Sequence, residues 1–245
     1  RITLAPARKS LSAQKQFIGN IAHELRTPLS IIKTNIEVSL LKNTLEDDYV
    51  KKMLRSNVEE LDRISDIINN LLSFSTLVKP ENVKFEKVNL GKVADNIVGK
   101  LGNLAKSKNI LLTVEKSGST VINSRISILE QIVMNLLKNA LHYTPVGGAV
   151  LVRVRQSDLN FIELQVEDTG IGIAPKDLHR IFEPFYRADP SRVHTHSGSG
   201  LGLAIVNELV RLHNGKIFIT SNLNQGTCVI ISFPTPPTKG GVLKT

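Results

Sequence analysis

His23 and Glu24 are the first neighbouring residues in the chain that could do chemistry together. They lie in the stretch FIGNIAHELRTPLS, residues 17–30, whose apolar residues recur with the spacing of an amphipathic helix. At 100° per residue His23 falls roughly 150° from the centre of the apolar stripe, so its imidazole is expected in solvent. A neutral imidazole is a good nucleophile near neutral pH, and a carboxylate that accepts one ring N–H makes the other nitrogen more nucleophilic. The pair therefore suits the capture of a phosphoryl group, although a histidine on a helix is more often a plain surface residue.

Pro28 strengthens the functional interpretation of this helix. A proline inside a helix removes one backbone hydrogen bond, clashes one turn back, here at Glu24, and costs about 3 kcal/mol. Thr27 lies one turn after His23 on the same face. Such a cost beside an exposed histidine and glutamate indicates a site that must be approached and a bend used in switching.

A second group of residues could hold a phosphate-bearing ligand. The segment NLLKNALHY, residues 135–143, places Asn135 and Asn139 one turn apart on a helix, where two carboxamides suit a Mg²⁺ ion that bridges phosphates. In VEDTGIGI, residues 166–173, an alternating strand ends at Asp168 and is followed by Gly170 and Gly172. The glycines allow a close approach of backbone to ligand, and a buried Asp168 could accept a hydrogen bond from an adenine amine.

The segment GSGLGLAI, residues 198–205, adds Gly198, Gly200 and Gly202 directly before a helical pattern. The first N–H groups of such a helix would face phosphate oxygens. Each of these segments alone is also compatible with an ordinary loop or a core helix, so the prediction depends on their occurring together.

Two regions with different periodicity must position these residues. Steps of three and four between apolar residues over 10–42 and again over 50–71 predict a helical hairpin. A single hairpin buries its apolar stripe poorly, whereas two hairpins form a four-helix bundle, so we expect a homodimer. Beyond Pro80, six short runs typical of strands (83–88, 109–115, 149–155, 161–167, 215–221, 227–233) alternate with helical stretches at 90–107, 126–142 and 201–213.

The predicted fold is therefore a multi-domain one: an all-α helical hairpin that forms a dimeric four-helix bundle, then an α+β sandwich. The second region is expected to be an open sheet with helices on one face. The predicted boundaries are 1–79 for the hairpin domain, 80–236 for the sandwich domain and 237–245 for a Pro- and Gly-rich tail.

The composition excludes several classes of protein. The single cysteine, Cys228, excludes a disulfide framework and fits a reducing compartment. The net charge is +9, but the basic residues are scattered and only 4% of residues are aromatic, so nucleic-acid binding is not expected. No apolar run reaches the roughly 18 residues of a membrane helix. The chain begins with Arg1 rather than Met, so we expect a fragment of a longer protein.

The seven residues HELRTPL, 23–29, resemble the phosphoacceptor box of HisKA-type sensor histidine kinases of two-component systems. The resemblance implies that His23 is autophosphorylated and that Glu24 assists removal of its proton. It also implies that Thr27 orients water when a phosphorylated partner is dephosphorylated.

The later segments, in their order, resemble the N, G1, F and G2 boxes of the ATP-binding (Bergerat) domain shared by gyrase, heat-shock chaperones, histidine kinases and mismatch-repair proteins. The F box is IFEPFYR, whose aromatic residues Phe182 and Phe185 would anchor a mobile lid while Arg187 meets the terminal phosphates. The resemblance implies ATP as ligand, Mg²⁺ on Asn135 and Asn139, and no Walker P-loop. The ATP-binding residues that it implies are Asn135, Asn139, His142, Tyr143, Asp168, Gly170, Gly172, Arg187, Gly198, Gly200, Leu201, Gly202 and Thr227, the last near adenine.

Two positions discriminate within that superfamily. Members that hydrolyse ATP carry a glutamate in the N box to activate water, and this chain has Asn135 at the corresponding position. Such a site is expected to hold ATP and give its γ-phosphoryl group to His23. The N box commonly has a lysine three residues after its second asparagine, and this chain has His142. Because histidine is cationic only at lower pH, we expect weaker or more pH-dependent nucleotide binding.

The resemblance implies the catalytic core of a sensor kinase, with a homodimer, a response regulator receiver domain as partner and phosphatase activity toward it. It also implies a location on the cytoplasmic side of the plasma membrane, attached through an upstream segment. Two alternatives stay open: a pseudokinase scaffold that binds nucleotide without transfer, and a gyrase-like ATP-driven machine, which Asn135 and the hairpin disfavour. His194 and His196 resemble half of a zinc site, but without a third ligand a polar lid is favoured. The signal, the cognate regulator and the choice between cis and trans transfer are not determined.

Overall fold

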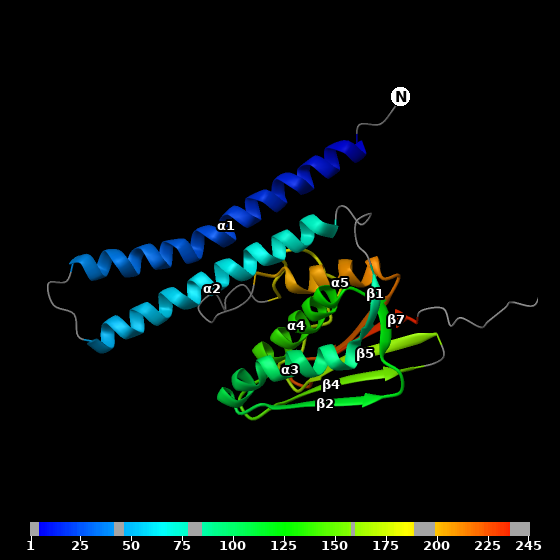
Figure 1. The fold of residues 1–245 in the computed structure, drawn as a ribbon. Helices are drawn as coiled ribbons and strands as arrows, with labels where there is room; N and C mark the ends of the chain where they lie inside the picture. The colour runs from blue at the N-terminus through cyan, green and yellow to red at the C-terminus, as the bar shows by residue number, and fades with distance from the viewer. Residues whose placement is uncertain (1–4, 42–46, 78–84, 158–159, 189–198, 236–245) are drawn as a thin grey trace, which may run out of the picture.

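The computed structural model describes residues 5–41, 47–77, 85–157, 160–188 and 199–235. The first two of these segments are helical, and the rest form a mixed α/β domain, here called the sheet domain (Figure 1). The elements in chain order are α1 (Ala5–Leu41), α2 (Asp47–Leu77), β1 (Glu86–Asn89), α3 (Leu90–Ser107), β2 (Leu111–Ser117), β3 (Val121–Ser124), α4 (Ile126–Tyr143), β4 (Ala149–Gln156), β5 (Phe161–Asp168), α5 (Gly202–Leu212), β6 (Lys216–Asn222) and β7 (Gly226–Pro234). The predicted fold class, a helical hairpin followed by an α+β domain, is confirmed.

Helices α1 and α2 run antiparallel as the predicted hairpin (Figure 1). The Nδ2 of Asn35 on α1 donates to Oδ1 of Asn57 at 2.8 Å and to Oγ of Ser56 at 3.3 Å, both on α2. Much of the apolar stripe is nevertheless left uncovered by this single hairpin. Between 36% and 83% of the surface is exposed at Ile18, Leu29, Ile36, Val38, Leu40, Leu41, Leu54, Val58, Leu61, Ile68 and Leu72.

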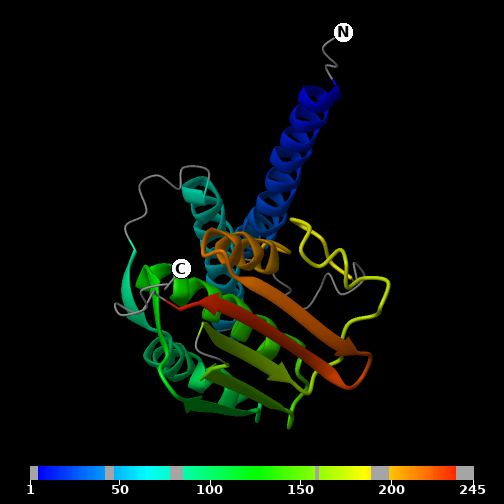
Figure 2. The same ribbon diagram turned by 90° about the vertical axis from the view of Figure 1, so that its right-hand side faces the viewer.

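The main sheet has five strands in the order β2-β4-β5-β7-β6. Only β2 and β4 are parallel; the remaining neighbours are antiparallel. In β4 and β5 alternate residues are buried, as expected for a sheet with one face in the core. Figure 2 shows the helices on one side of these strands, and the opposite face carries ion pairs such as Arg153 Nε to Glu115 Oε2 at 2.7 Å. The prediction of helices on one face is confirmed.

The prediction of one open sheet was wrong at its N-terminal strand. The run at 83–88 contributes β1, which pairs antiparallel with β3 in a separate two-stranded sheet. Sequence analysis missed β3, because four residues are too few for an alternating pattern to stand out. Val88 and Ile122 pair across this small sheet and are both buried, so it forms one border of the core.

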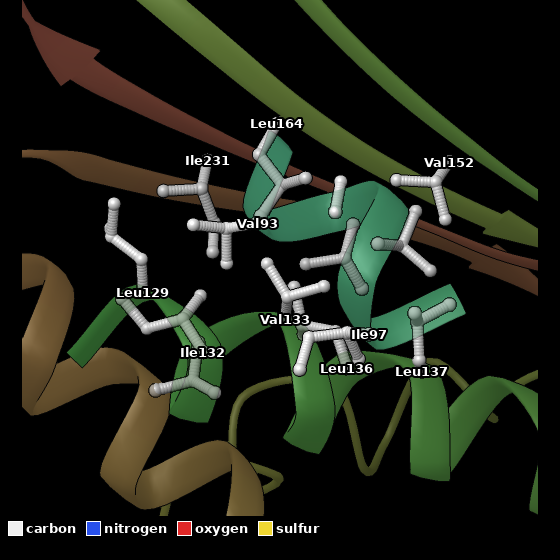
Figure 3. Close-up of a cluster of buried hydrophobic side chains, with 14 of the residues drawn as sticks. Val93, Ile97, Leu129, Ile132, Val133, Leu136, Leu137, Val152, Leu164 and Ile231 are labelled. Atoms are coloured by element: carbon white, nitrogen blue, oxygen red, sulfur yellow. The ribbon is translucent and has the colours of Figure 1, made fainter. Parts of the chain in front are cut away.

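The core lies between the helices and the main sheet (Figure 3). Helix α4 contributes most of its inward face, and α3 and the central strands close the cluster from the other sides. Burying each large aliphatic side chain contributes roughly 1.5–3 kcal/mol. The residues labelled in Figure 3 are Val93, Ile97, Leu129, Ile132, Val133, Leu136, Leu137, Val152, Leu164 and Ile231.

The sheet domain packs against α2. Nζ of Lys138 on α4 lies 3.0 and 2.8 Å from the two carboxylate oxygens of Asp66, and Leu71 packs against the core of the sheet domain. Ile67, between them on α2, is buried. The predicted boundary at 79/80 falls in 78–84, outside the described residues, as does the predicted tail, and both stay predictions. None of the described helices has the length and apolarity required to cross a bilayer.

Candidate functional site

The candidate nucleophile lies on the outer surface of α1. The side chain of His23 is exposed, as the helical spacing predicted. Oγ1 of Thr27 donates to the backbone carbonyl of His23 at 3.3 Å, so the two residues lie one turn apart on one face. Helix α1 continues through Pro28, whose side chain is buried. His23 is therefore accessible to a reactant in solvent.

Glu24 takes a different direction from its neighbour. Its carboxylate is only 18% exposed and lies 3.6 Å from Nη2 of Arg63 on α2. No hydrogen bond joins Glu24 to His23 in the part of the chain that the structure describes. The reason is helical geometry: successive side chains point about 100° apart, which turns Glu24 toward α2 while His23 points to solvent. In this conformation the Glu24 carboxylate faces Arg63 and not the His23 ring, and its role toward His23 stays a prediction.

In the sheet domain, residues from separate elements converge where β5 and β7 meet the turn after β5. Asp168 and Thr227 are paired in the register of these two strands. The Gly170 N–H donates to Oδ1 of Asp168 at 2.8 Å, and the Thr227 hydroxyl lies 2.9 Å from Oγ of Ser221. Gly226 has φ of 101°, and a Cβ there would collide with the carbonyl oxygen of Asp168. The glycine is required so that two backbones can meet beside the carboxylate.

Burial raises the pKa of the Asp168 carboxyl above its ordinary value. Hydrogen bonds from the backbone N–H groups of Gly170 and Thr227 oppose this shift, and the nearby charge of Glu167 adds to it. A carboxylate held in this way costs stability when it is ionised. Its acceptor oxygens would recover hydrogen bonding from a ligand that donates N–H.

The end of α4 borders the same region. The backbone carbonyl of Tyr143 accepts from the N–H of Ile171 at 3.2 Å, so the turn after β5 is attached to this helix end. A Cβ on Gly170 would lie 2.8 Å from that carbonyl oxygen. His142 stacks edge-on against Tyr143, with ring centroids 4.7 Å apart.

Lys108, which sequence analysis did not single out, contributes a cation at this helix end. Its Nζ donates to the carbonyl oxygens of Leu141 at 2.8 Å and His142 at 3.4 Å, which suits the negative end of the helix dipole. No local pattern predicts this contact, because the partners lie 33 and 34 residues away.

Asn135 is the residue whose surroundings most clearly fit a bound ligand. Its Nδ2 is buried and has no hydrogen-bond partner among the described residues. A Cβ on Gly202 would lie 3.7 Å from Cγ of Asn135, so the N-box helix and the start of α5 are adjacent. A buried unpaired amide costs stability unless a ligand or water satisfies it. A phosphate oxygen beside Nδ2 would do so, and the carboxamide oxygens of Asn135 and half-buried Asn139 are suitable Mg²⁺ ligands. The residues present therefore fit both.

A backbone hydrogen bond joins the segment between β5 and α5 to the glycine turn, and both residues that make it have a positive φ. Phe185 has φ of 65°, a rare value for a bulky residue, and its N–H donates to the carbonyl of Gly200 at 3.0 Å. Gly200 has φ of 69°, and a Cβ there would lie 2.8 Å from the carbonyl carbon of Phe185. The F box and the last glycine box are thus in direct contact. Strain of this kind clusters at functional sites.

The remaining residues predicted for the site are either placed by the structure or lie outside the described residues. Tyr186 donates its hydroxyl to Oδ1 of Asp177 at 2.8 Å, a contact that sequence analysis missed. Phe182 and Arg187 are half-buried, and Leu201 is buried. Gly172 has φ of 67° and lies against the backbone of Asn222. Gly198, His194 and His196 fall outside the described residues. Among the described residues, no group of three His, Cys, Asp or Glu side chains could hold a metal ion.

Two family models match this chain. The His Kinase A (phospho-acceptor) domain matches residues 13–79, and the histidine kinase-, DNA gyrase B- and HSP90-like ATPase matches residues 124–237. The first contains His23, and the second contains Asn135, Asp168 and the glycine turns.

Similar proteins cover both parts. The sensor histidine kinase CusS of Escherichia coli O157:H7 is 34% identical over 222 residues, which are 90% of this chain and 45% of CusS. The solved structure of the mycobacterial sensor histidine kinase MprB is 33% identical, with a TM-score of 0.53 over 63% of this chain and 99% of that chain. The histidine kinase ThkA, solved in complex with response regulator protein TrrA, matches 96% of this chain and 66% of that chain with a TM-score of 0.75 and 23% identity. The chain spans less than half the length of CusS.

Proposed function

The chain belongs to the sensor histidine kinases, and we propose that it is the catalytic core of such a kinase, a protein-histidine kinase that phosphorylates itself on His23. ATP is the phosphoryl donor, and the phosphoryl group then passes to an aspartate on the receiver domain of a response regulator. The observation that carries the proposal is the buried, unpaired Nδ2 of Asn135 beside Gly202 in a chain that also exposes His23. The first feature fits a phosphate-bearing ligand, and the second fits an external nucleophile.

The adenine end of ATP is assigned to Asp168 and Thr227. Asp168 is buried enough for its pKa to be raised, and it already accepts the Gly170 N–H through Oδ1 at 2.8 Å. The phosphates are assigned to the turn at Gly200, Leu201 and Gly202, and to Asn139, His142, Tyr143 and Arg187; Gly198 lies outside the described residues, and its role stays a prediction. Asn135 and Asn139 would hold Mg²⁺. When bound, this ion would neutralise negative charge on the phosphates.

In the proposed transfer, the lone pair of one imidazole nitrogen of His23 forms a bond to the γ-phosphorus of ATP. The bond from that phosphorus to the bridging oxygen breaks, and ADP leaves with the electron pair. The proton on the other ring nitrogen is accepted by a carboxylate, the role assigned to Glu24. Asn135 takes the place of a glutamate that would activate water, which favours transfer to His23 over hydrolysis. Thr27, one turn from His23, is assigned to orient the water that hydrolyses the phosphorylated aspartate of the regulator and releases phosphate.

The partners follow from the exposed surfaces. The uncovered apolar stripe on the hairpin is the kind of surface that a second hairpin covers in a four-helix bundle, which supports a homodimer. The regulator is proposed to dock on the hairpin around His23, and the relative with the same fold, ThkA, was solved with a response regulator protein. Membrane attachment on the cytoplasmic side stays a prediction from the family resemblance.

The experiment that tests the proposal is incubation with γ-labelled ATP and Mg²⁺, beside the variant His23→Gln. We expect acid-labile, alkali-stable label on the protein and none on the variant, while both bind nucleotide. Nucleotide binding without label would favour the pseudokinase scaffold, and steady release of phosphate without phosphoprotein would favour the ATP-driven machine. Transfer of label to a purified receiver domain tests the second step.

A further inference from the structure

Three charged side chains in the hairpin form a cluster that contains one positive charge and two negative charges. Arg63 of α2 lies between two carboxylates, Glu24 of α1 and Glu60 of α2. Nη2 of Arg63 is 3.6 Å from Oε2 of Glu24, and Nη1 is 4.0 Å from Oε2 of Glu60. The three side chains are only 21%, 18% and 13% exposed in the order Arg63, Glu24, Glu60. One guanidinium therefore serves two largely buried carboxylates.

Neither carboxylate is fully paired in this arrangement. Oε2 of Glu24, Oε2 of Glu60 and Nε of Arg63 are all buried without a hydrogen-bond partner among the residues that the structure describes. Both ion pairs are longer than a hydrogen bond, so the guanidinium stands between its two acceptors. A guanidinium binds a carboxylate best in a bidentate contact, and Arg63 makes that contact with neither of them here, since each carboxylate meets only one of its terminal nitrogens. A small movement toward Glu24 or toward Glu60 would satisfy one carboxylate and release the other.

The location of the cluster gives this choice a chemical consequence. Glu24 follows His23 directly in the chain, and Glu60 is three residues before Arg63 on the same helix. A carboxylate drawn toward the guanidinium on α2 faces away from the exposed His23 ring on the outer side of α1. Glu24 can accept an imidazole N–H only when Arg63 is engaged elsewhere.

We propose that Arg63 is a positioning residue that switches Glu24 between two states, and that Glu60 is its competing partner. When Arg63 pairs with Glu24, the carboxylate is kept away from His23 and phosphoryl transfer is slow. When Arg63 pairs with Glu60, Glu24 is free to accept the proton from one ring nitrogen while the other nitrogen forms the bond to phosphorus and ADP leaves. This inference rests on the proposed function, because it assigns the base for that reaction.

The position of the cluster also connects it to the sheet domain. Asp66, which binds Lys138 of α4, lies one helical turn after Arg63, and buried Ile67 follows it. Docking of the sheet domain on α2 therefore acts on the same stretch of helix that carries the switch.

Opposite effects at two members of the cluster test the proposal. In Glu60→Gln the competitor is lost and Arg63 is left to Glu24, so the autophosphorylation rate should fall about tenfold, a fraction of what a general base contributes. In Arg63→Gln the restraint is lost, so the rate should stay at or above that of the wild type. The Kd for ATP should change less than twofold in both. If Arg63→Gln unfolds, the double variant Arg63→Gln/Glu60→Gln leaves a neutral neighbour and should match or exceed the wild-type rate.

Two controls separate a switch from a structural role. Asp62→Asn removes one exposed charge from the same helix turn and should leave the rate within twofold of the wild type. Arg63→Lys keeps the positive charge, so its autophosphorylation rate should be lower than that of Arg63→Gln. A loss of rate in Arg63→Gln and in the double variant, equal to that in Glu60→Gln, would overturn the proposal, because all three would then report damage to the hairpin.

A readout without ATP distinguishes failure of this inference from failure of the proposed function. Diethyl pyrocarbonate acylates the free imidazole nitrogen, and its rate at His23 is measured by mass spectrometry. We expect slower modification in Glu60→Gln and faster modification in the double variant than in the wild type. This order should appear even if the chain transfers no phosphoryl group. Equal rates in all variants would refute the switch while leaving the kinase assignment untouched.

Discussion

Replacing Asp168 with asparagine should move the stability of the nucleotide-free protein and its affinity for ATP in opposite directions. Burial raises the pKa of this carboxyl, so the folded chain binds its proton more tightly than the unfolded chain does. The stability that this group contributes is full below the ordinary aspartate pKa, about 3.9, and is lost as the pH rises through the raised value. At neutral pH the ionised carboxylate costs stability, and a neutral amide removes that cost.

The loss of affinity follows from the hydrogen bonds around this residue. Oδ1 of Asp168 accepts the Gly170 N–H at 2.8 Å, so the amide of Asp168→Asn must keep its oxygen there. Its NH₂ group then faces the position proposed for the adenine amine, and two donors meet. A hydrogen bond to a charged acceptor contributes about 1.5–3 kcal/mol, so the Kd for ATP should rise by roughly 10- to 150-fold.

Calorimetric titration with a non-hydrolysable ATP analogue gives the affinity, and urea unfolding with and without nucleotide gives the stability. At a nucleotide concentration 100 times the wild-type Kd, binding stabilises the wild type by about 2.7 kcal/mol, but a variant with 100-fold weaker affinity by only about 0.4 kcal/mol.

The matched control is Glu167→Gln, the same change at the exposed neighbour, which should leave the affinity within twofold. A variant Asp168→Asn that is less stable than the wild type without nucleotide at pH 7, yet binds ATP normally, would refute the reasoning. The carboxylate would then be a structural acceptor and not a ligand group.

Three further changes have expected outcomes. Burial lowers the pKa of His213, whose Nδ1 donates to the Leu209 carbonyl at 2.7 Å. The stability that neutral His213 contributes is therefore full above a pH of about 6.5 and is lost as the pH falls through the lowered pKa. In His213→Gln the free energy of unfolding should depend less on pH between pH 7 and 5 than in the wild type. Gly226→Ala adds a Cβ against the Asp168 carbonyl at φ of 101° and should lower the free energy of unfolding in urea by at least about 2 kcal/mol. The control is Gly147→Ala at an exposed glycine, which also has a positive φ but has no atom near the added Cβ, so it should show the cost of backbone strain without the collision. His142→Lys should tighten ATP binding and flatten its pH dependence; an unchanged calorimetric profile would contradict the role of His142.

Several elements could be read from local patterns. Helix α3 begins and ends at the predicted residues 90 and 107, and α4 ends one residue after its predicted end at 142. The exposure of His23 followed from helical spacing alone. Repeating apolar residues report which face of an element is buried, and that information is present in any short window of sequence.

The candidate site was predicted as a set of motifs, and the convergence of Asp168, Thr227 and the glycines near α4 agrees with that set. The roles of these residues stay predictions. Strand β3, the Lys108 contact with the end of α4 and the Tyr186 hydrogen bond to Asp177 had no local signal. Each depends on a partner that the fold selects from many polar residues of the same kind.

The sequence by itself determined the two architectures, the exposed nucleophile and the ordered boxes of a nucleotide site, because periodicity and contiguous motifs are local properties of the chain. Only the tertiary structure decided where Glu24 points. Its partner Arg63 lies 39 residues away on the other helix, and the crossing of α1 and α2 brings these charges together with Glu60 in a space that excludes most water. Long-range pairing of this kind is set by how helices pack, and no spacing within one helix encodes it.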